Sequence, residues 1–174
     1  MNIYIIDDHA LFRNGLVSLL ESRNISAVAA ASPEQGLVEI SSLDLDIILL
    51  DLRMPQMSEL EVLKALKGQD VKTPVVMLTT STEENDLRYC LKYGAQGYLL
   101  KDMDPDELVG ALNEVVSGSI VVAQDMTYIL AKVLKNELTD SESSFDVLTN
   151  REKEVACQVA SGHSNKVIAR ELGI

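Results

Sequence analysis

The sequence predicts an α/β fold in which helices cover both faces of a parallel β-sheet. Five short apolar runs, at residues 3–6, 25–30, 47–50, 74–78 and 97–100, alternate with longer segments of helical periodicity. Runs this short and this continuously apolar are typical of strands buried on both faces of a parallel sheet. Repeated strand–helix alternation places the crossover helices on the two faces. We expect this (βα)5 unit to occupy residues 1–117.

The segments between the apolar runs carry the start signals of helices. Ser32, Ser58 and Ser81 are each followed three residues later by Gln or Glu, which is the capping-box pattern. Asp104 and Pro105 supply an N-cap and a proline at the first helical position. These signals predict a helix after the second, third, fourth and fifth strands.

The chain changes character beyond residue 117. An amphipathic helix is predicted over residues 123–137, followed by a polar, acidic stretch over 138–146, so we expect a linker at 118–146. Residues 147–174 predict two short helices that begin after Thr149 and Ser164. Two such helices are too small to bury a core. This all-α domain is therefore predicted to be incomplete.

Charge is distributed unevenly along the 174 residues. The 15 Lys and Arg against 27 Asp and Glu leave a net charge of −12, which excludes a protein that coats nucleic acid or an anionic membrane with its whole surface. Residues 147–174 carry four basic and three acidic side chains, a net charge of +1, so residues 1–146 carry −13. Only the C-terminal segment is expected to lie against DNA.

The chain reads as a cytoplasmic protein. Its N-terminal apolar stretch has no basic flank and stops at Asp7, unlike a signal peptide, and no apolar run approaches the roughly 20 residues of a membrane span. Cys90 and Cys157 are 67 residues apart and form no metal-ligand pattern. That spacing favours buried thiols in a reducing compartment.

Polar and charged side chains follow four of the predicted strands. Asp7 and Asp8 end the first run, Asp51 the third, Thr79 the fourth and Lys101 the fifth. Because ligands bind beyond the carboxyl ends of parallel strands, we expect these groups to gather at one edge of the sheet. Converging carboxylates repel one another unless a cation lies between them, and hard oxygen ligands suit Mg²⁺. Since successive side chains along a strand point to opposite faces, spacing alone places only one of Asp7 and Asp8 in the site.

Such a set of groups is suited to phosphoryl transfer. An aspartate beside Mg²⁺ can attack phosphorus and form an aspartyl phosphate. Mg²⁺ and a nearby lysine would then neutralise the charge on the phosphoryl oxygens.

Several separated motifs stand at these strand ends and helix starts: Asp7-Asp8-His9, Asp51-Leu52-Arg53-Met54-Pro55, Thr79, Gly94-Ala95 and Gly97-Tyr98-Leu99-Leu100-Lys101-Asp102. Together they resemble the receiver domain of two-component response regulators. Residues 148–155 (LTNREKEV) and 164–169 (SNKVIA) resemble the LuxR-type helix-turn-helix of the NarL/FixJ subfamily. The resemblance covers nearly the whole chain and implies a flavodoxin-like receiver with strand order 2-1-3-4-5.

The resemblance implies a phosphoacceptor and a metal site. Asp51 would accept the phosphoryl group, so that phosphorylation and dephosphorylation are autocatalysed and the protein is not an enzyme in the usual sense. Asp8, Asp51 and the backbone carbonyl of Arg53 would hold Mg²⁺ directly, while Asp7 would act through water.

The resemblance also implies a switch. Lys101 would pair with the phosphoryl group, Thr79 would donate a hydrogen bond to it, and Tyr98 would change rotamer in response. Without the resemblance, a half-buried packing role is favoured for Tyr98 over a switch role. A sensor histidine kinase would supply the phosphoryl group, and phosphorylation would favour a homodimer.

A helix-turn-helix reads bases with its second helix. By resemblance, residues 165–172 are the first, positioning helix, and the recognition helix would begin after Ile174. Thr149 and Lys166 would make weak phosphate contacts that carry no sequence information. We therefore expect promoter DNA as a partner only of a chain completed beyond Ile174.

Two positions depart from the family pattern. Glu59 stands where the family has glycine, so either the loop is strained there, or Ser58 starts the helix earlier and Glu61 completes the cap. Arg53 either brings a cation to the mouth of the site and alters the dephosphorylation rate, or is a solvated loop arginine.

Three functions are compatible with these observations. The first is a transcription regulator switched by phosphorylation, and the second is a receiver-only protein that acts as a phosphoryl sink or heterodimer partner. The third is an aspartate-nucleophile phosphatase. That enzyme class has an Asp-x-Asp motif directly after a strand, whereas here Leu52 and Arg53 follow Asp51, and the motif precedes the strand at residues 44–46.

Overall fold

The computed structural model describes residues 1–140 except Arg53 and Gln56, with side chains described as far as Lys135. Residues 141–174, including Thr149, Cys157 and Lys166, lie outside the described residues. One compact unit comprises Met1–Leu130, and it contains every strand of the described part.

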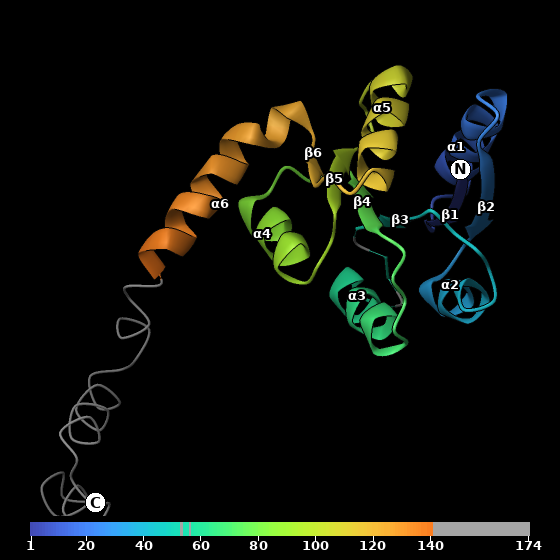
Figure 1. Ribbon diagram of the computed structural model, residues 1–174, viewed down its shortest axis with the longest axis horizontal. Coiled ribbons are helices and arrows are strands. Elements are labelled where there is room, and N and C mark those ends of the chain that lie inside the picture. The colour runs from blue at the N-terminus through green and yellow to red at the C-terminus, as the bar shows by residue number, and fades with distance from the viewer. Residues whose placement is uncertain (53, 56, 141–174) are drawn as a thin grey trace, which may run out of the picture. The chain divides into compact units, whose positions relative to one another are not determined.

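The centre of this unit is a parallel sheet with strand order β2-β1-β3-β4-β5-β6 (Figure 1). The strands are β1 (Asn2–Ile6), β2 (Ser26–Ala30), β3 (Ile47–Asp51), β4 (Val75–Thr79), β5 (Gly97–Leu100) and β6 (Val121–Val122). The five predicted strands and the order 2-1-3-4-5 are confirmed. The two-residue β6 was not predicted, because a segment this short shows no periodicity.

Helices cover both faces of the sheet. Helices α1 (Ala10–Ser22) and α5 (Pro105–Val116) lie on one face, and α2 (Pro33–Ile40), α3 (Glu59–Gly68) and α4 (Glu84–Lys92) lie on the other (Figure 1). Along β1, Ile3 and Ile5 join the core beneath α1 and α5, whereas Tyr4 and Ile6 join the opposite core. Burial on both faces is the reason that the strands read as continuous apolar runs.

The helix predicted over residues 123–137 has two parts. A 3₁₀ turn (Gln124–Met126) precedes α6 (Thr127–Asp140). None of the helices in the described part of the chain has both the length and the apolarity to cross a membrane.

The loop before α3 decides between the two readings of Glu59. Ser58 is the N-cap, its hydroxyl accepts from the Glu61 amide, and the Glu61 carboxylate accepts from the Ser58 amide at 2.9 Å. Glu59 is the first residue of α3. Among the described non-glycine residues, positive φ occurs at Asn24 and Asp70, so the strained alternative is wrong and the earlier helix start is confirmed.

Two other predicted capping boxes differ from expectation. Ser32 caps α2 by accepting from the Gln35 amide, but the Gln35 side chain donates to Glu39 instead of completing a box. Ser81 is not an N-cap, because α4 begins at Glu84 and has Glu83 in the capping position. The Ser81 side chain is instead buried beside the carboxyl end of β4.

Replacing Ser58 by alanine is expected to lower the free energy of unfolding by about 1 kcal/mol, because the Glu61 amide loses its acceptor. Urea unfolding followed by circular dichroism measures the change. Ser41→Ala is the matched control, because the exposed Ser41 hydroxyl only donates to the carbonyl of Val38. Equal losses in the two variants would remove the capping explanation.

Of the two cysteines, Cys90 lies within the described residues and is buried, as predicted. Burial raises the pKa of its thiol to about 12, and the nearby carboxylates of Glu59 and Asp86 act in the same direction. At neutral pH this thiol is therefore protonated and packs as an apolar side chain.

Candidate metal centre

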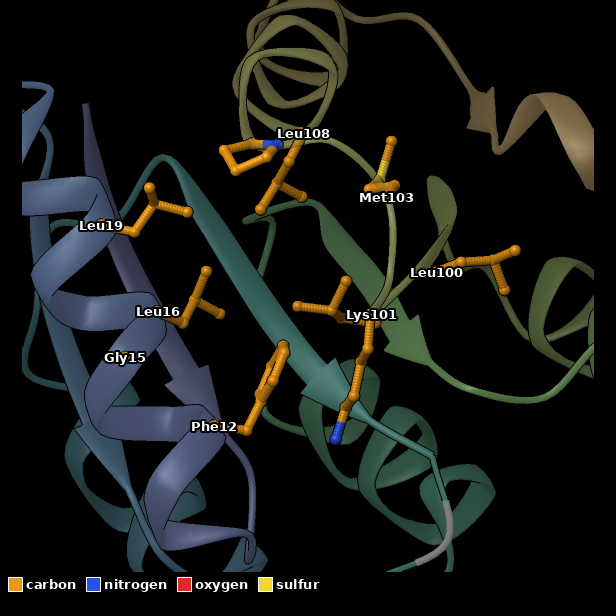
Figure 2. Close-up of a pocket in the computed structure, with 10 residues that line it drawn as sticks. Phe12, Gly15, Leu16, Leu19, Leu100, Lys101, Met103 and Leu108 are labelled. Atoms are coloured by element: carbon orange, nitrogen blue, oxygen red, sulfur yellow. The ribbon is translucent and has the colours of Figure 1, made fainter.

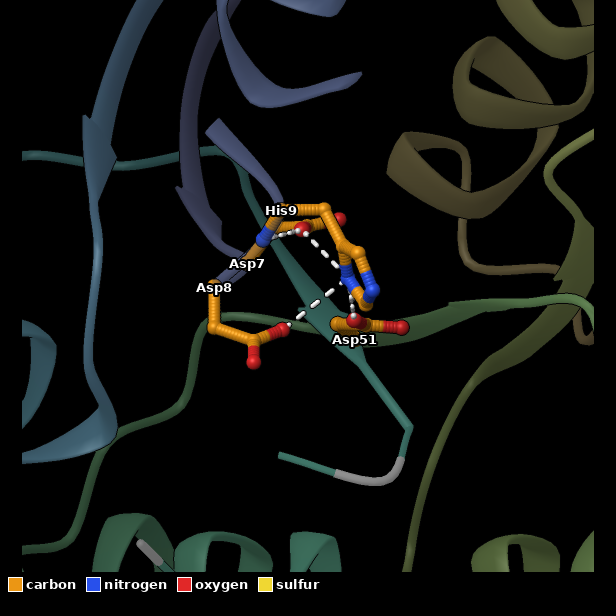
Figure 3. Close-up of side chains that lie close together, drawn as sticks. All are labelled: Asp7, Asp8, His9 and Asp51. Atoms are coloured by element: carbon orange, nitrogen blue, oxygen red, sulfur yellow. Dashed lines mark hydrogen bonds and ion pairs between the residues drawn. The ribbon is translucent and has the colours of Figure 1, made fainter. Parts of the chain in front are cut away.

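The carboxyl ends of β1 and β3 bring three aspartates and a histidine together. One ligand atom from each of Asp7, Asp8, His9 and Asp51 lies within 4.8 Å of the others. Figure 3 shows these four side chains gathered at the strand ends. Asp51 is the last residue of β3, and the aspartate pair follows β1, which pairs directly with β3. Both members of the pair can reach the site because β1 ends at Ile6, so Asp7 and Asp8 lie in the turn before α1 and are not bound to the alternation of a strand.

Lys101 joins the cluster from the end of β5. Its ammonium nitrogen lies 2.8 Å from Asp7 Oδ2 and 2.9 Å from Asp51 Oδ1. The same nitrogen lies 4.6 Å from the centre of the Phe12 ring, which comes from the first turn of α1. Phe12 and Lys101 line one side of an apolar pocket of about 220 Å³ between α1 and the start of α5 (Figure 2). The ring limits the directions in which the lysine can move.

His9 is the residue that sequence reasoning left without a role. Its Nδ1 lies 3.0 Å from Asp8 Oδ1, 3.4 Å from Asp51 Oδ2 and 3.5 Å from Asp7 Oδ1. Its backbone amide donates to Asp7 Oδ1 at 2.7 Å. The available signal was its place directly after the aspartate pair.

The two oxygens of Asp51 have different surroundings. Oδ1 is paired with Lys101, whereas Oδ2 is buried and accepts no hydrogen bond from the described residues; Asp8 Oδ1 is in the same situation. Burial raises the pKa of the Asp51 carboxyl, the neighbouring Asp7 carboxylate adds to the rise, and the Lys101 ammonium opposes it. These two buried oxygens accept no hydrogen bond, although both lie within ion-pair distance of His9 Nδ1, and a hard divalent cation would satisfy both.

The direction of this pKa shift gives a pH prediction for the metal-free protein. A carboxyl whose pKa is higher in the folded state than its ordinary 3.8 favours folding at low pH and disfavours it once ionised. Asp51→Asn is therefore expected to raise the melting temperature in EDTA at pH 7, with a smaller gain at about pH 4. Calorimetry at the two pH values measures both gains. A lower melting temperature for the variant at pH 7 would contradict this electrostatic account.

The end of β4 contributes a buried hydrogen-bonded chain. Thr79 Oγ1 accepts from the Ser81 amide at 3.0 Å, and the Tyr98 hydroxyl donates to the Ser81 carbonyl at 3.0 Å. The Ser81 hydroxyl donates to Asp86 of α4 at 2.5 Å and accepts from the Glu83 amide. Tyr98 is fully buried rather than half-buried. Arg53, whose carbonyl was predicted to be a metal ligand, lies outside the described residues.

Comparison with known proteins places this site in a family. Residues 3–113 match the response regulator receiver domain, and residues 146–174 match the luxR family of bacterial regulatory proteins. The chain is 40% identical over 174 residues to the nitrate/nitrite response regulator NarL of Escherichia coli, covering 99% of this chain and 81% of that protein. The chain is a two-component response regulator of the NarL/FixJ family.

This response regulator has further relatives in other bacteria. It is 33% identical over 175 residues to the transcriptional regulatory protein YdfI of Bacillus subtilis, which covers 99% of this chain and 81% of that protein. Its fold matches the receiver domain of the putative response regulator NarL from Mycobacterium tuberculosis with a TM-score of 0.62, 33% identity, and coverage of 67% of this chain and 96% of that one. A receiver domain implies a histidine kinase as partner, and a LuxR-type domain implies DNA binding. The cluster of Asp7, Asp8 and Asp51 is consistent with the metal site of a receiver.

Proposed function

We propose that Asp51 is the phosphoacceptor of this response regulator and that a sensor histidine kinase donates the phosphoryl group. The observation that carries the proposal is the asymmetric environment of the Asp51 carboxylate. One oxygen is held by the Lys101 ammonium, and the other is buried without a hydrogen bond. Phosphorylation would replace a buried charge with a group whose oxygens Lys101 and Thr79 can bind.

Mg²⁺ is the proposed cofactor. Asp8 Oδ1 and Asp51 Oδ2, the two buried oxygens that accept no hydrogen bond, would be direct ligands, together with the backbone carbonyl of Arg53. Asp7 would act through water, because its Oδ2 pairs with Lys101 and its Oδ1 accepts from the His9 amide. When bound, Mg²⁺ would supply charge neutralisation for the phosphoryl oxygens.

The chemistry proposed for the chain's own residues is nucleophilic. A carboxylate oxygen of Asp51 attacks phosphorus, an acyl–phosphate bond forms, and the phosphorus–nitrogen bond to the kinase histidine breaks. The departing imidazole keeps the electron pair of that bond and takes a proton from solvent. Lys101 stabilises the phosphoryl oxygens through its positive charge. Hydrolysis of the acyl phosphate by water returns Asp51 to its starting state, so one residue serves both half-reactions.

Thr79 and Tyr98 are the proposed switch residues. A Thr79 hydroxyl drawn to a phosphoryl oxygen would release the Ser81 amide, and Ser81 also holds the Tyr98 hydroxyl and Asp86 of α4. Shifting the ratio of two conformations of a domain from 1:99 to 99:1 requires about 5.5 kcal/mol of differential stabilisation. Hydrogen bonds to a charged group contribute about 1.5–3 kcal/mol each, so a few suffice.

The proposed output is regulated DNA binding in the cytoplasm. We propose a receiver at residues 1–117, a linker at 118–146 and the LuxR-type domain from 147 onward, with a homodimer favoured by phosphorylation. Thr149 and Lys166 are the proposed phosphate contacts. The family match over residues 146–174 and the positive net charge of that segment support this assignment.

Incubation with acetyl phosphate and Mg²⁺ tests the proposed function. Intact mass spectrometry is expected to detect one added phosphoryl group, lost on alkaline treatment as an acyl phosphate is. Borohydride reduction before digestion should mark the peptide that contains Asp51. A stable ester on a hydroxyl residue, or no Mg²⁺-dependent incorporation, would rule the proposal out.

A further inference from the structure

Phe12 lies on the core-facing stripe of α1, at the end of the helix nearest the proposed phosphorylation site. The stripe continues at a spacing of four residues with Leu16 and Leu20, which are buried against the sheet. Phe12 is partly buried and packs against the same core. Since leucine is sufficient for packing at the next two positions of the stripe, an aromatic ring at the first position suggests a further role.

The root and the tip of the Lys101 side chain are held separately. The Lys101 amide donates to the Thr79 carbonyl at 2.8 Å, which fixes where the side chain starts. At the tip, the ammonium nitrogen lies 2.8 Å from Asp7 Oδ2 and 2.9 Å from Asp51 Oδ1. The centre of the Phe12 ring lies 4.6 Å from the same nitrogen, inside the roughly 6 Å range of a cation–π contact (Figure 2). The ring is therefore a third group that acts on the ammonium.

Burial strengthens the contact between the ring and the lysine. The Lys101 side chain is 10% exposed, so its ammonium is largely removed from water. The negative face of an aromatic ring attracts a cation most strongly when the pair is desolvated. By comparison, the contact of Lys64 with the Tyr93 ring, at 5.1 Å, involves an exposed lysine. The Phe12 ring is thus placed to influence a buried charge beside Asp51.

We propose that Phe12 is a positioning residue for phosphoryl transfer to Asp51. The inference rests on the proposed function, in which the Lys101 ammonium stabilises the phosphoryl oxygens. A lysine has a flexible four-carbon stem, and a fixed charge stabilises a transition state better than one that must first be brought into place. The ring holds the ammonium beside Asp51 before the phosphoryl group arrives. Phe12 therefore acts on the reaction through Lys101.

A double-mutant cycle on the full chain tests the proposal. The initial rate of phosphoryl incorporation from acetyl phosphate and Mg²⁺ is measured for the wild type, Phe12→Leu, Lys101→Met and the double variant. Phe12→Leu keeps an apolar side chain but removes the ring, and is expected to lower the rate about tenfold. In the Lys101→Met background the same substitution is expected to change the rate by less than about twofold, because no cation remains for the ring to hold. Equal losses in the two backgrounds would overturn the positioning role.

A change that keeps the ring separates attraction from packing. Replacing Phe12 with pentafluorophenylalanine preserves an apolar six-membered ring but reverses the electrostatic potential at its face. The rate is expected to fall at least as far as in Phe12→Leu, and circular dichroism at the assay temperature checks that the variant is folded. The same replacement at Phe145, the chain's other phenylalanine, is the matched control and should leave the rate unchanged. A wild-type rate with the fluorinated ring at position 12 would overturn the proposal.

The outcomes separate this inference from the proposed function. Absence of Mg²⁺-dependent incorporation in the wild type, or an undiminished rate in Lys101→Met, would defeat the proposed function and this inference with it. A wild-type chain that is phosphorylated, with a rate that falls in Lys101→Met but not in Phe12→Leu, would defeat only the role of Phe12.

Discussion

Asp51→Asn is expected to abolish phosphorylation by acetyl phosphate, with a loss on the order of a thousand-fold or more in the rate of incorporation. The asparagine amide has nearly the same shape as the carboxylate but lacks the anionic oxygen that attacks phosphorus. Phosphate-affinity gel electrophoresis over a time course measures the rate. The same variant is expected to be at least as stable as the wild type, so the loss would not reflect unfolding.

Asp44→Asn is the matched control for this experiment. Asp44 is exposed and belongs to the Asp-x-Asp pattern at residues 44–46, which lies before β3 rather than after it. This control should incorporate phosphoryl groups at the wild-type rate. Retained incorporation in Asp51→Asn, or a loss of incorporation in Asp44→Asn, would contradict the assignment of Asp51 as the phosphoacceptor.

Lys101→Met is expected to be the most destabilising substitution at the site in the absence of divalent cations. Asp7 and Asp51 are 2% and 3% exposed, and the ammonium of Lys101 is paired with both. Leaving buried charges unpaired costs about 3–5 kcal/mol, which corresponds to a fall in melting temperature of roughly 10 °C or more. Lys92→Met, at an exposed lysine of α4, should change the melting temperature little.

The double variant Asp51→Asn/Lys101→Met shows whether the unpaired charge is the cause. Asp51→Asn is expected to stabilise Lys101→Met by more than it stabilises the wild type, because without the lysine it removes a buried carboxylate that has lost its cation. If the two substitutions were simply additive, the account based on Asp51 would be wrong.

With Mg²⁺ present, Lys101→Met should also slow phosphorylation by about a hundredfold, the cost of losing one fixed charge at the reacting group.

The strand pattern and the edge of the sheet could be predicted from the sequence because both follow from local rules. Burial on two faces makes strands such as β3 and β4 continuously apolar. Parallel strands then bring their carboxyl ends to one edge, so Asp51, Thr79 and Lys101 had to be neighbours. Local helix chemistry was equally predictable at Ser58 and Asp104, where the caps form as expected.

Predictions failed where a distant contact overrides a local signal. The capping pattern at Ser81 is present in the sequence, but the Ser81 hydroxyl bonds to Asp86 and its backbone to Thr79 and Tyr98. β6 is held by backbone hydrogen bonds from the Val121 amide to Gln96 and from the Ala123 amide to Tyr98. The hydrophobic periodicity of the sequence does not indicate these contacts.

By itself, the sequence determined the parallel α/β fold, the acidic strand edge and the family, because periodicity, strand-end position and motif spacing are properties of the chain. Only the tertiary structure decided how each donor atom is used. It placed the His9 imidazole beside the aspartates and the Phe12 ring against Lys101. It also left Asp8 Oδ1 and Asp51 Oδ2 without a hydrogen bond, whereas both oxygens of Asp7 are engaged by Lys101 and the His9 amide. Those assignments depend on side-chain directions where segments distant in the chain meet, and directions of that kind are set by packing.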